Sequence, residues 1–298
     1  MVILFVFFFI HLLDSRSVTT FARGEASVGK SIGDINVLVG AGNIADCSTS
    51  DSDITANILN DTPGTIFTTG NNVLGRAALI DYIKCFGQTW GKYIDRIRPS
   101  LGSSDYSTAN ASGYFSYFGD SAGPAGKGYY SYNLASWHIV VLNSNCDQVG
   151  GCDENSVQSK WLKSDLSQNK AFCTLAYWSA PLFNSAKAGD SLAVKPFWRI
   201  LYAAHADVVI NGGENGYERF ALQDVSGKKD NKNGIREFIV GTGGGGYALA
   251  GRISKNSEIR NYDTFGLLKL SLSDKSYNWQ FLSESNSKFK DSGLGVCQ

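Results

Sequence analysis

The sequence has 298 residues, of which 43% are hydrophobic, 12% aromatic and 18% charged. This composition is typical of a globular chain and excludes an intrinsically disordered one. The 27 basic and 27 acidic residues balance, and no basic block indicates nucleic-acid binding.

The chain starts with an uninterrupted apolar stretch, residues 2–10, followed by His11, Leu12 and Leu13. This stretch is shorter than the roughly 20 residues that a membrane span needs. It predicts a secretory signal peptide over residues 1–24, cleaved somewhere after about residue 17. A retained N-terminal anchor is the alternative, because the charged region that usually precedes such a stretch is missing. We expect a secreted, extracellular protein whose residues 25–298 form one domain without a membrane span.

The first hundred residues repeat the order strand, polar loop, helix. Strands are predicted over residues 35–40, 65–70 and about 96–101. Apolar spacing predicts helices over residues 52–59 and 76–86, the second with Leu79, Ile80 and Ile83 facing inward. This alternation is typical of a mostly parallel sheet.

The middle and the end of the chain are richer in strands. A tight antiparallel hairpin is expected from residues 129–134 and 137–142. Helices are expected over residues 155–166, with Val157, Trp161, Leu162 and Leu166 on one face, and over 192–205. Further strands are predicted over residues 172–178, 207–211, 217–223, 235–241, 264–271 and 275–282. The glycine run 241–246 is interpreted as a turn, since no Gly-Lys-Ser/Thr follows it.

Six cysteines indicate disulfides, because an even number behind a signal peptide is typical of a secreted protein. They are Cys47, Cys85, Cys146, Cys152, Cys173 and Cys297. Cys146 and Cys152 flank a short flexible loop and should pair. For the others we favour Cys47 with Cys85 and Cys173 with Cys297, although six cysteines allow 15 connectivities. Asn60 and Asn110 lie in glycosylation sequons, which count only in a eukaryotic host.

One stretch carries the strongest functional signal. The predicted strand 207–211 ends in Asn-Gly-Gly, and Tyr-Glu-Arg-Phe follows at residues 217–220. This order resembles the last motif of the calcineurin-like metallophosphoesterases, which include the purple acid phosphatases. In that family the loop reads Gly-His-x-His, and its two histidines bind two metal ions. Here Gly213 and Asn215 stand at the histidine positions.

Four earlier motifs of the same family are matched in the same way: the flanking residues are present, but the metal-binding residues are replaced. Gly-Asp-Ile is matched by Gly42-Asn43-Ile44, and Gly-Asp-Asn by Gly70-Asn71-Asn72. Gly-Asn-His-Asp is matched by Gly102-Ser103-Ser104-Asp105, and Trp-His-x-Pro by Trp178-Ser179-Ala180-Pro181. The resemblance covers about residues 37–298 and implies an α/β fold, a four-layer αββα sandwich of two mixed sheets. It places the degenerate metal positions at Asn43, Asn71, Ser103, Ser104, Ser179, Gly213 and Asn215.

The replaced residues are poor metal ligands for a definite reason. Two divalent cations about 4 Å apart need anionic ligands, above all a bridging carboxylate, to offset their repulsion. Asparagine and serine are neutral, and glycine has no side chain. Only three histidines occur, at 11, 138 and 205, and His138 is read as a core residue. We therefore expect a neutral cleft without cofactor or metal.

The polar residues left near these motifs receive structural interpretations. Asn72, Asp105 and Glu214 are expected to be cleft residues, and a weak calcium site on Asp105 and Glu214 is disfavoured because calcium prefers several carboxylates. Glu218 and Arg219 are read as ion-pair residues. No Gly-x-Ser-x-Gly motif supports a serine nucleophile.

The leading hypothesis is a secreted, catalytically inactive protein of this fold with a structural, self-assembling or ligand-binding role. Its partner would be a second copy, in a homo-oligomer or filament, or an extracellular protein or glycan. Most aromatic residues of the stretch 114–130 are expected to be core residues or loop anchors, and some could form a self-association patch. The alternatives are a phosphoric-ester hydrolase with an atypical metal site, and a glycan or small-molecule binder that uses the neutral cleft.

Overall fold

Two mixed sheets and their covering helices make up the computed structural model, which describes residues 36–298. The expected signal peptide and His11 lie outside the described residues. The strands of the first sheet are β1 (Asn36–Ala41), β2 (Thr65–Thr68), β3 (Ile97–Arg98), β11 (Gly266–Ser273), β12 (Ser276–Ser283) and β13 (Ser292–Val296). Their order is β13-β12-β11-β1-β2-β3, parallel from β1 to β3 and antiparallel from β1 to β13.

The second sheet has a parallel centre with antiparallel edges. Its strands are β4 (Tyr130–Leu134), β5 (Trp137–Val141), β6 (Cys173–Tyr177), β7 (Val208–Asn211), β8 (Tyr217–Phe220), β9 (Arg236–Val240) and β10 (Ser257–Asn261). The order is β10-β8-β9-β7-β6-β5-β4, with β5, β6, β7 and β9 parallel. The strands β5 and β7 are buried along their whole length, as their continuous apolar runs require.

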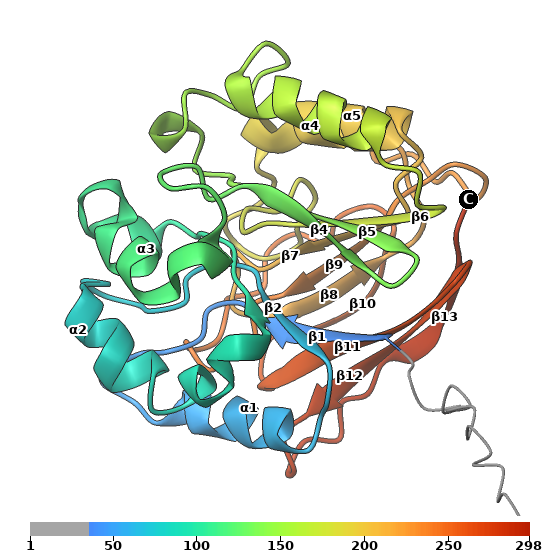
Figure 1. Ribbon diagram of the computed structural model, residues 1–298. Coiled ribbons are helices and arrows are strands. Elements are labelled where there is room, and N and C mark those ends of the chain that lie inside the picture. Colours follow the sequence, from blue (N-terminus) through green and yellow to red (C-terminus); the bar gives the residue numbers. More distant parts are fainter. Residues whose placement is uncertain (1–35) are drawn as a thin grey trace, which may run out of the picture. The chain divides into compact units, whose positions relative to one another are not determined.

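The helices cover the outer faces of the two sheets, so that four layers result (Figure 1). The helices α4 (Val157–Gln168) and α5 (Lys195–Ala203) lie over the second sheet, and α1 (Asp51–Asn60) lies under the first. The short helices α2 (Leu79–Asp81), continued by a π-helical turn at Tyr82–Phe86, and α3 (Ser112–Phe118) pack beside the sheets. The expected αββα architecture is confirmed.

Aromatic side chains fill the space between the two sheets. Trp137 meets Tyr277 edge-on, with ring centroids 5.7 Å apart, and Phe67 meets Tyr177 at 5.6 Å. Each such side chain buries a large apolar area, so this layer supplies much of the hydrophobic stabilisation. A second core cluster lies between the second sheet and the helices α4 and α5.

One predicted helix face is wrong. Leu79, Ile80 and Ile83 are exposed, because Tyr82 and Phe86 turn the opposite face of this segment into the core. The predicted face of α4 is confirmed for Trp161, Leu162 and Leu166, which pack in the second core cluster, whereas Val157, the first residue of the helix, is exposed.

Several predicted boundaries also shift. The strand expected over residues 96–101 is only two residues long, and the helix expected over 192–205 begins as a 3-10 turn and ends at Ala203. The strands β10 and β13 were not predicted, because their sequences are short and polar or glycine-rich. Most of the aromatic-rich stretch is core: Tyr114, Phe118 and Tyr129 are buried.

Three disulfides join the cysteines in the pairs favoured from the sequence: Cys47–Cys85, Cys146–Cys152 and Cys173–Cys297. The last one connects β6 of the second sheet to the residue that follows β13 of the first sheet. Within residues 36–298, no helix is long and apolar enough to cross a bilayer.

Candidate functional site

The loops that carry the degenerate metal positions meet at one edge of the sandwich. The parallel strands β1 and β2 end there in the first sheet, and β6, β7 and β9 in the second. A backbone hydrogen bond joins the two sets, because the Gly42 N–H donates to the Val240 carbonyl of β9 (2.8 Å). Within the first set, the Asn43 N–H after β1 donates to the Gly70 carbonyl after β2 (3.0 Å). The carboxyl ends of parallel strands are where α/β folds usually bind ligands.

Asn43 and Asn71 form the centre of this site and bind each other. The Asn71 Nδ2 donates to the Asn43 Oδ1 at 2.7 Å, and the Asn71 Oδ1 accepts from the Ser104 N–H at 2.9 Å. Both asparagines are buried and both have a left-handed backbone, with φ of 52° and 53°. Among non-glycine residues, asparagine and aspartate adopt this conformation most readily, so the backbone explains why a short polar residue stands there.

The remaining degenerate positions surround this amide pair. The Ser179 carbonyl accepts from the N–H groups of Gly212 (2.9 Å) and Gly213 (2.7 Å). The Asn215 Nδ2 donates to the Gly245 carbonyl at 3.3 Å. Ser103 is exposed. A Cβ atom at Gly213 would lie 3.1 Å from the Ser179 carbonyl oxygen, so even the first atom of a side chain is tight there.

The glycine run 241–246 is more than a turn, because it packs against the loop of Asn43. The Gly243 N–H donates to the Gly42 carbonyl (2.9 Å), and the Gly245 N–H donates to the Asn43 carbonyl (2.7 Å). A Cβ atom at Gly243 would lie 2.7 Å from the Gly42 carbonyl oxygen, so this close backbone approach requires glycine. The glycine run therefore holds the loop of Asn43 in place through backbone hydrogen bonds.

The Asp105 carboxylate is fully hydrogen-bonded to other protein groups. It is fully buried and accepts hydrogen bonds from the Tyr82 hydroxyl (2.6 Å), the Gly102 N–H (2.8 Å), and the N–H (3.0 Å) and Nδ2 (3.1 Å) of Asn72. Burial raises the pKa of Asp105, although these hydrogen bonds favour its charged form. Both carboxylate oxygens are used to join the loops after β2 and β3. Glu214 is half-buried, and burial raises its pKa too.

The comparisons with known proteins agree with this geometry. No family model matches the sequence. Two Arabidopsis thaliana proteins are similar over part of the chain. Purple acid phosphatase 18 is 31% identical over 129 residues, which are 41% of this chain and 28% of that protein. Probable purple acid phosphatase 20 is 32% identical over 139 residues, which are 44% of this chain and 31% of that protein. The matched stretch therefore spans less than a third of these relatives.

Solved structures extend the similarity to nearly all of the described chain. The purple acid phosphatase PPD1 from yellow lupin superposes with a TM-score of 0.67 and 14% identity, over 88% of this chain and 53% of that one. GAP50, the anchor in the inner membrane complex of Plasmodium, superposes with a TM-score of 0.69 and 15% identity, over 88% and 89%. The chain is related to the calcineurin-like metallophosphoesterases.

The side chains at the metallophosphoesterase positions do not fit a dinuclear metal centre. A bridging ligand needs lone pairs directed at both cations, but the Asn71 Nδ2 presents N–H groups, one of which is donated to the Asn43 Oδ1. The Asn71 Oδ1 already accepts from the backbone. No carboxylate or imidazole replaces these amides, so the repulsion between two cations would be uncompensated.

Two side-chain atoms at the site are buried without partners. The Asn43 Nδ2 and the Asn72 Oδ1 make no hydrogen bond to any residue of 36–298. Asn72 otherwise donates to the Ser100 carbonyl and to Asp105. The metallophosphoesterase frame is thus held by neutral amides that are only partly satisfied by protein groups.

The other titratable residues singled out in the sequence are structural. The His138 Nε2 bonds the Asp165 carboxylate at 2.7 Å and its Nδ1 lies 3.0 Å from the Asn133 Oδ1, so it is a core histidine with both ring nitrogens engaged. Glu218 accepts from the N–H and hydroxyl of Ser185 instead of forming an ion pair.

Arg219, in contrast, forms the expected ion pairs, with Asp291 and Glu258. Within the described chain, one group of three metal-type residues lies close together: Cys173, Asp207 and Cys297. Its two cysteines are joined in a disulfide.

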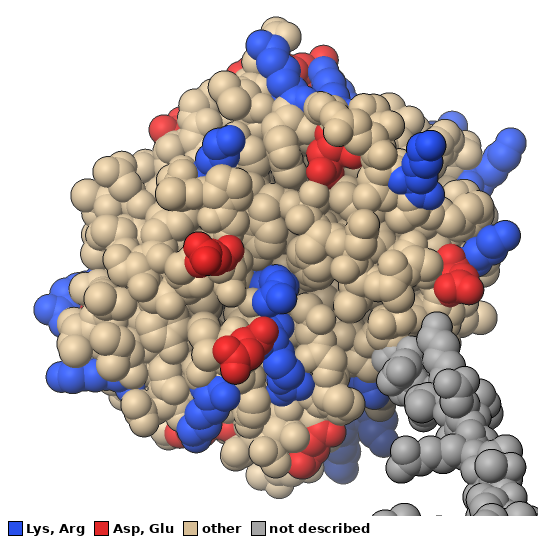
Figure 2. All heavy atoms as spheres, viewed as in Figure 1, with Lys and Arg blue, Asp and Glu red and all other residues tan. Residues whose placement is uncertain are grey.

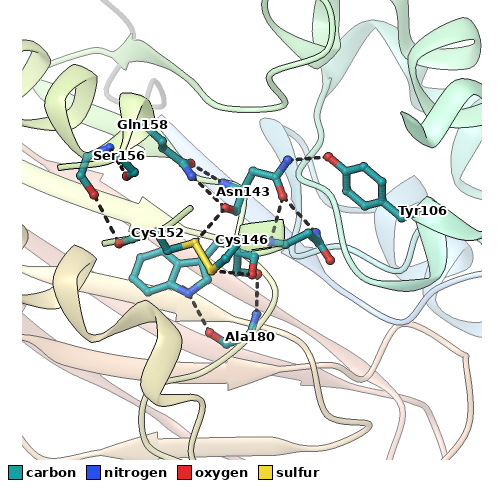
Figure 3. Close-up of a disulfide and its surroundings, with 11 residues drawn as sticks. Tyr106, Asn143, Cys146, Cys152, Ser156, Gln158 and Ala180 are labelled. Atoms are coloured by element: carbon teal, nitrogen blue, oxygen red, sulfur yellow. Dashed lines mark hydrogen bonds between the residues drawn. A yellow bond between two sulfur atoms is a disulfide. The ribbon is translucent and has the colours of Figure 1, made fainter. Parts of the chain in front are cut away.

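Sequence reasoning missed Asn143, which organises the loop after β5. Figure 3 shows it between Tyr106 and Gln158, beside the Cys146–Cys152 disulfide. Its Nδ2 donates to the Tyr106 hydroxyl (2.8 Å), and its backbone N–H and carbonyl bond the Gln158 amide (2.8 and 2.9 Å). No motif marks this residue, because its partners come from distant parts of the chain.

Proposed function

We propose that this chain is a secreted, non-catalytic protein of the metallophosphoesterase fold that acts by binding rather than by hydrolysis. The observation that supports this most directly is the hydrogen bond between Asn71 and Asn43. It puts a neutral amide pair where phosphoester hydrolysis by this fold needs a bridging carboxylate and two cations.

A serine- or cysteine-based mechanism has no support either. Within residues 36–298, the two histidines are His138, whose ring nitrogens bond Asp165 and Asn133, and His205, which follows α5. The cysteines of this part are all in disulfides. A nucleophile at Ser103, Ser104 or Ser179 would need a general base within hydrogen-bond distance, and none of the hydrogen bonds of these serines involves one.

A binding role suits the surface and the fold. On the face shown in Figure 2, basic and acidic side chains are scattered or intermixed, without a region of one sign. Such a surface favours a protein or glycan partner over nucleic acid. The structure of GAP50, described as an anchor, has this same fold over most of its length. The three disulfides and the apolar N-terminal stretch support an extracellular location.

Metal content and phosphatase activity test this proposal together. Protein purified from a eukaryotic secretory host without chelators should contain far less than one equivalent of zinc, iron or manganese. It should not hydrolyse p-nitrophenyl phosphate faster than buffer, with or without added metal. A plant purple acid phosphatase, measured in the same assay, is the positive control. Stoichiometric metal together with turnover that a chelator abolishes would overturn the proposal.

A further inference from the structure

An exposed apolar strip borders the degenerate site. It consists of Tyr247, Leu249 and Ile253, which are 53%, 68% and 56% exposed. The strip directly follows the glycine run that seals Asn43, and the Ala248 N–H donates to the carbonyl of Asn215, itself a degenerate position (2.7 Å). Large apolar side chains grouped on the surface of a soluble protein indicate an interaction surface.

The backbone of the strip is held firmly. The Leu249 carbonyl accepts from the Lys187 N–H (2.9 Å), and the Gly251 N–H donates to the Ser185 carbonyl (2.9 Å). The Ser254 N–H donates to the Ser185 Oγ (2.8 Å), and this hydroxyl in turn donates to the buried Glu218.

The aromatic end of the strip is fixed as well, because the ring of Tyr247 stacks on Phe265 with centroids 4.5 Å apart and planes 16° apart. A pre-organised surface of this kind loses little conformational entropy when a partner binds.

The two ends of the strip carry opposite charge. At the Tyr247 end, the ring stacks on Phe265, whose N–H donates to the Glu284 carboxylate (3.0 Å), and the exposed Asp263 lies two residues before Phe265. At the other end, Arg252 precedes Ile253 and Lys255 follows it, both exposed.

We propose that this strip is the docking surface for a second copy of the same chain. Two strips related by a two-fold axis run in opposite directions, so the acidic end of each one faces the basic end of the other. The apolar side chains then meet in the middle, where water is excluded, and the charges form a complementary rim. This inference goes beyond the proposed non-catalytic role and does not depend on it, because self-association and metal content are measured separately.

Sedimentation equilibrium of the full secreted chain, from micromolar to millimolar concentration, tests the proposal. The wild type should show a reversible monomer–dimer equilibrium. The double variant Leu249→Ser with Ile253→Ser should raise the dissociation constant at least about tenfold, because central apolar contacts dominate such interfaces. The control is Leu294→Ser, which removes a leucine that is 61% exposed on the edge strand β13 and should leave the dissociation constant unchanged.

A charge swap tests the two-fold arrangement itself. Arg252→Glu and Asp263→Arg should each weaken the dimer at least about tenfold, since each brings like charges together across the axis. The two substitutions combined should restore the dissociation constant to within about threefold of wild type. Lys255→Glu gives a second measure of the basic end if one of these variants does not fold, which circular dichroism would reveal.

Several outcomes would overturn the proposal. A wild type that stays monomeric up to millimolar concentration would do so, and the strip would then serve a different partner. So would a dimer that Leu294→Ser disrupts and the strip variants leave intact. Single charge reversals without effect, or a swap that fails to restore association, would exclude the two-fold arrangement.

Discussion

The amide pair of Asn43 and Asn71 makes a quantitative prediction about the residues it replaces. Converting both to aspartate would bring two carboxylates to the 2.7 Å separation that now joins the Asn71 Nδ2 and the Asn43 Oδ1. At an effective dielectric constant of about 20, two unit charges at this distance repel by about 6 kcal/mol. Relaxation and water will reduce this value, and we expect a coupling free energy of at least about 3 kcal/mol.

Each single substitution should cost much less. In Asn43→Asp the new carboxylate still accepts from the Asn71 Nδ2, and in Asn71→Asp it still accepts from the Ser104 N–H. The Asn43 Nδ2, which now has no protein partner, becomes available to that second carboxylate. The repulsion therefore exists only in the double variant and is read from a double-mutant cycle.

The assay is urea unfolding of the wild type, the two single variants and the double variant, at neutral and at acid pH. The pair of carboxylates should share a proton in the folded state, so its folded pKa is raised above the unfolded value. Stability of the double variant should thus recover as pH falls and be lost as pH rises through that pKa. As a control, Asn155→Asp at an exposed position is combined with Asn43→Asp, and the free-energy costs of these two substitutions should simply add. Coupling below about 0.5 kcal/mol at neutral pH would refute the assignment of this contact.

Three further predictions concern stability. Burial raises the pKa of Asp207 from its ordinary value of 3.8 to about 6, so the wild type loses up to about 3 kcal/mol between these values as pH rises. Asp207→Asn should abolish this loss in urea titrations at about pH 4 and about pH 7, and an unchanged pH dependence would contradict it. Replacing Cys173 and Cys297 by serine opens a loop of 124 residues and should cost up to about 5 kcal/mol in thermal unfolding; a cost below about 1 kcal/mol would contradict this. Asp105→Ala leaves several buried donors without an acceptor and should cost about 3–5 kcal/mol by urea unfolding, whereas a surface-like cost below about 0.5 kcal/mol would contradict its buried role.

The positions of the site loops could be predicted from the sequence because neighbouring residues determine them. The motifs that begin at Gly42, Gly70 and Gly212 directly follow strands rich in β-branched residues, and the carboxyl ends of parallel strands converge in this fold. The Cys146–Cys152 pairing could be derived in the same way, because only five residues separate the two cysteines. Local pattern and tertiary structure agree at these positions.

The rest depends on contacts between distant parts of the chain. Residues 76–86 have two apolar faces, and periodicity alone cannot tell which one is buried. In the structure Tyr82 and Phe86 are buried, and Leu79 and Ile80 are exposed. A glycine run is compatible with a turn and with a close backbone approach, and only the position of the Asn43 loop decides between them. The burial of Asp105 likewise depends on Tyr82, a residue from another segment.

The Cys173–Cys297 bridge also determines how the protein bears mechanical load. An edge strand such as β13, pulled from its end, would normally peel away one hydrogen bond at a time. Here tension applied at the C-terminus passes first through a covalent bond to β6, an interior strand of the other sheet. Unravelling from that end therefore requires the interior of the second sheet to yield, and a reductant should lower the unfolding force measured when the chain is pulled by its C-terminus.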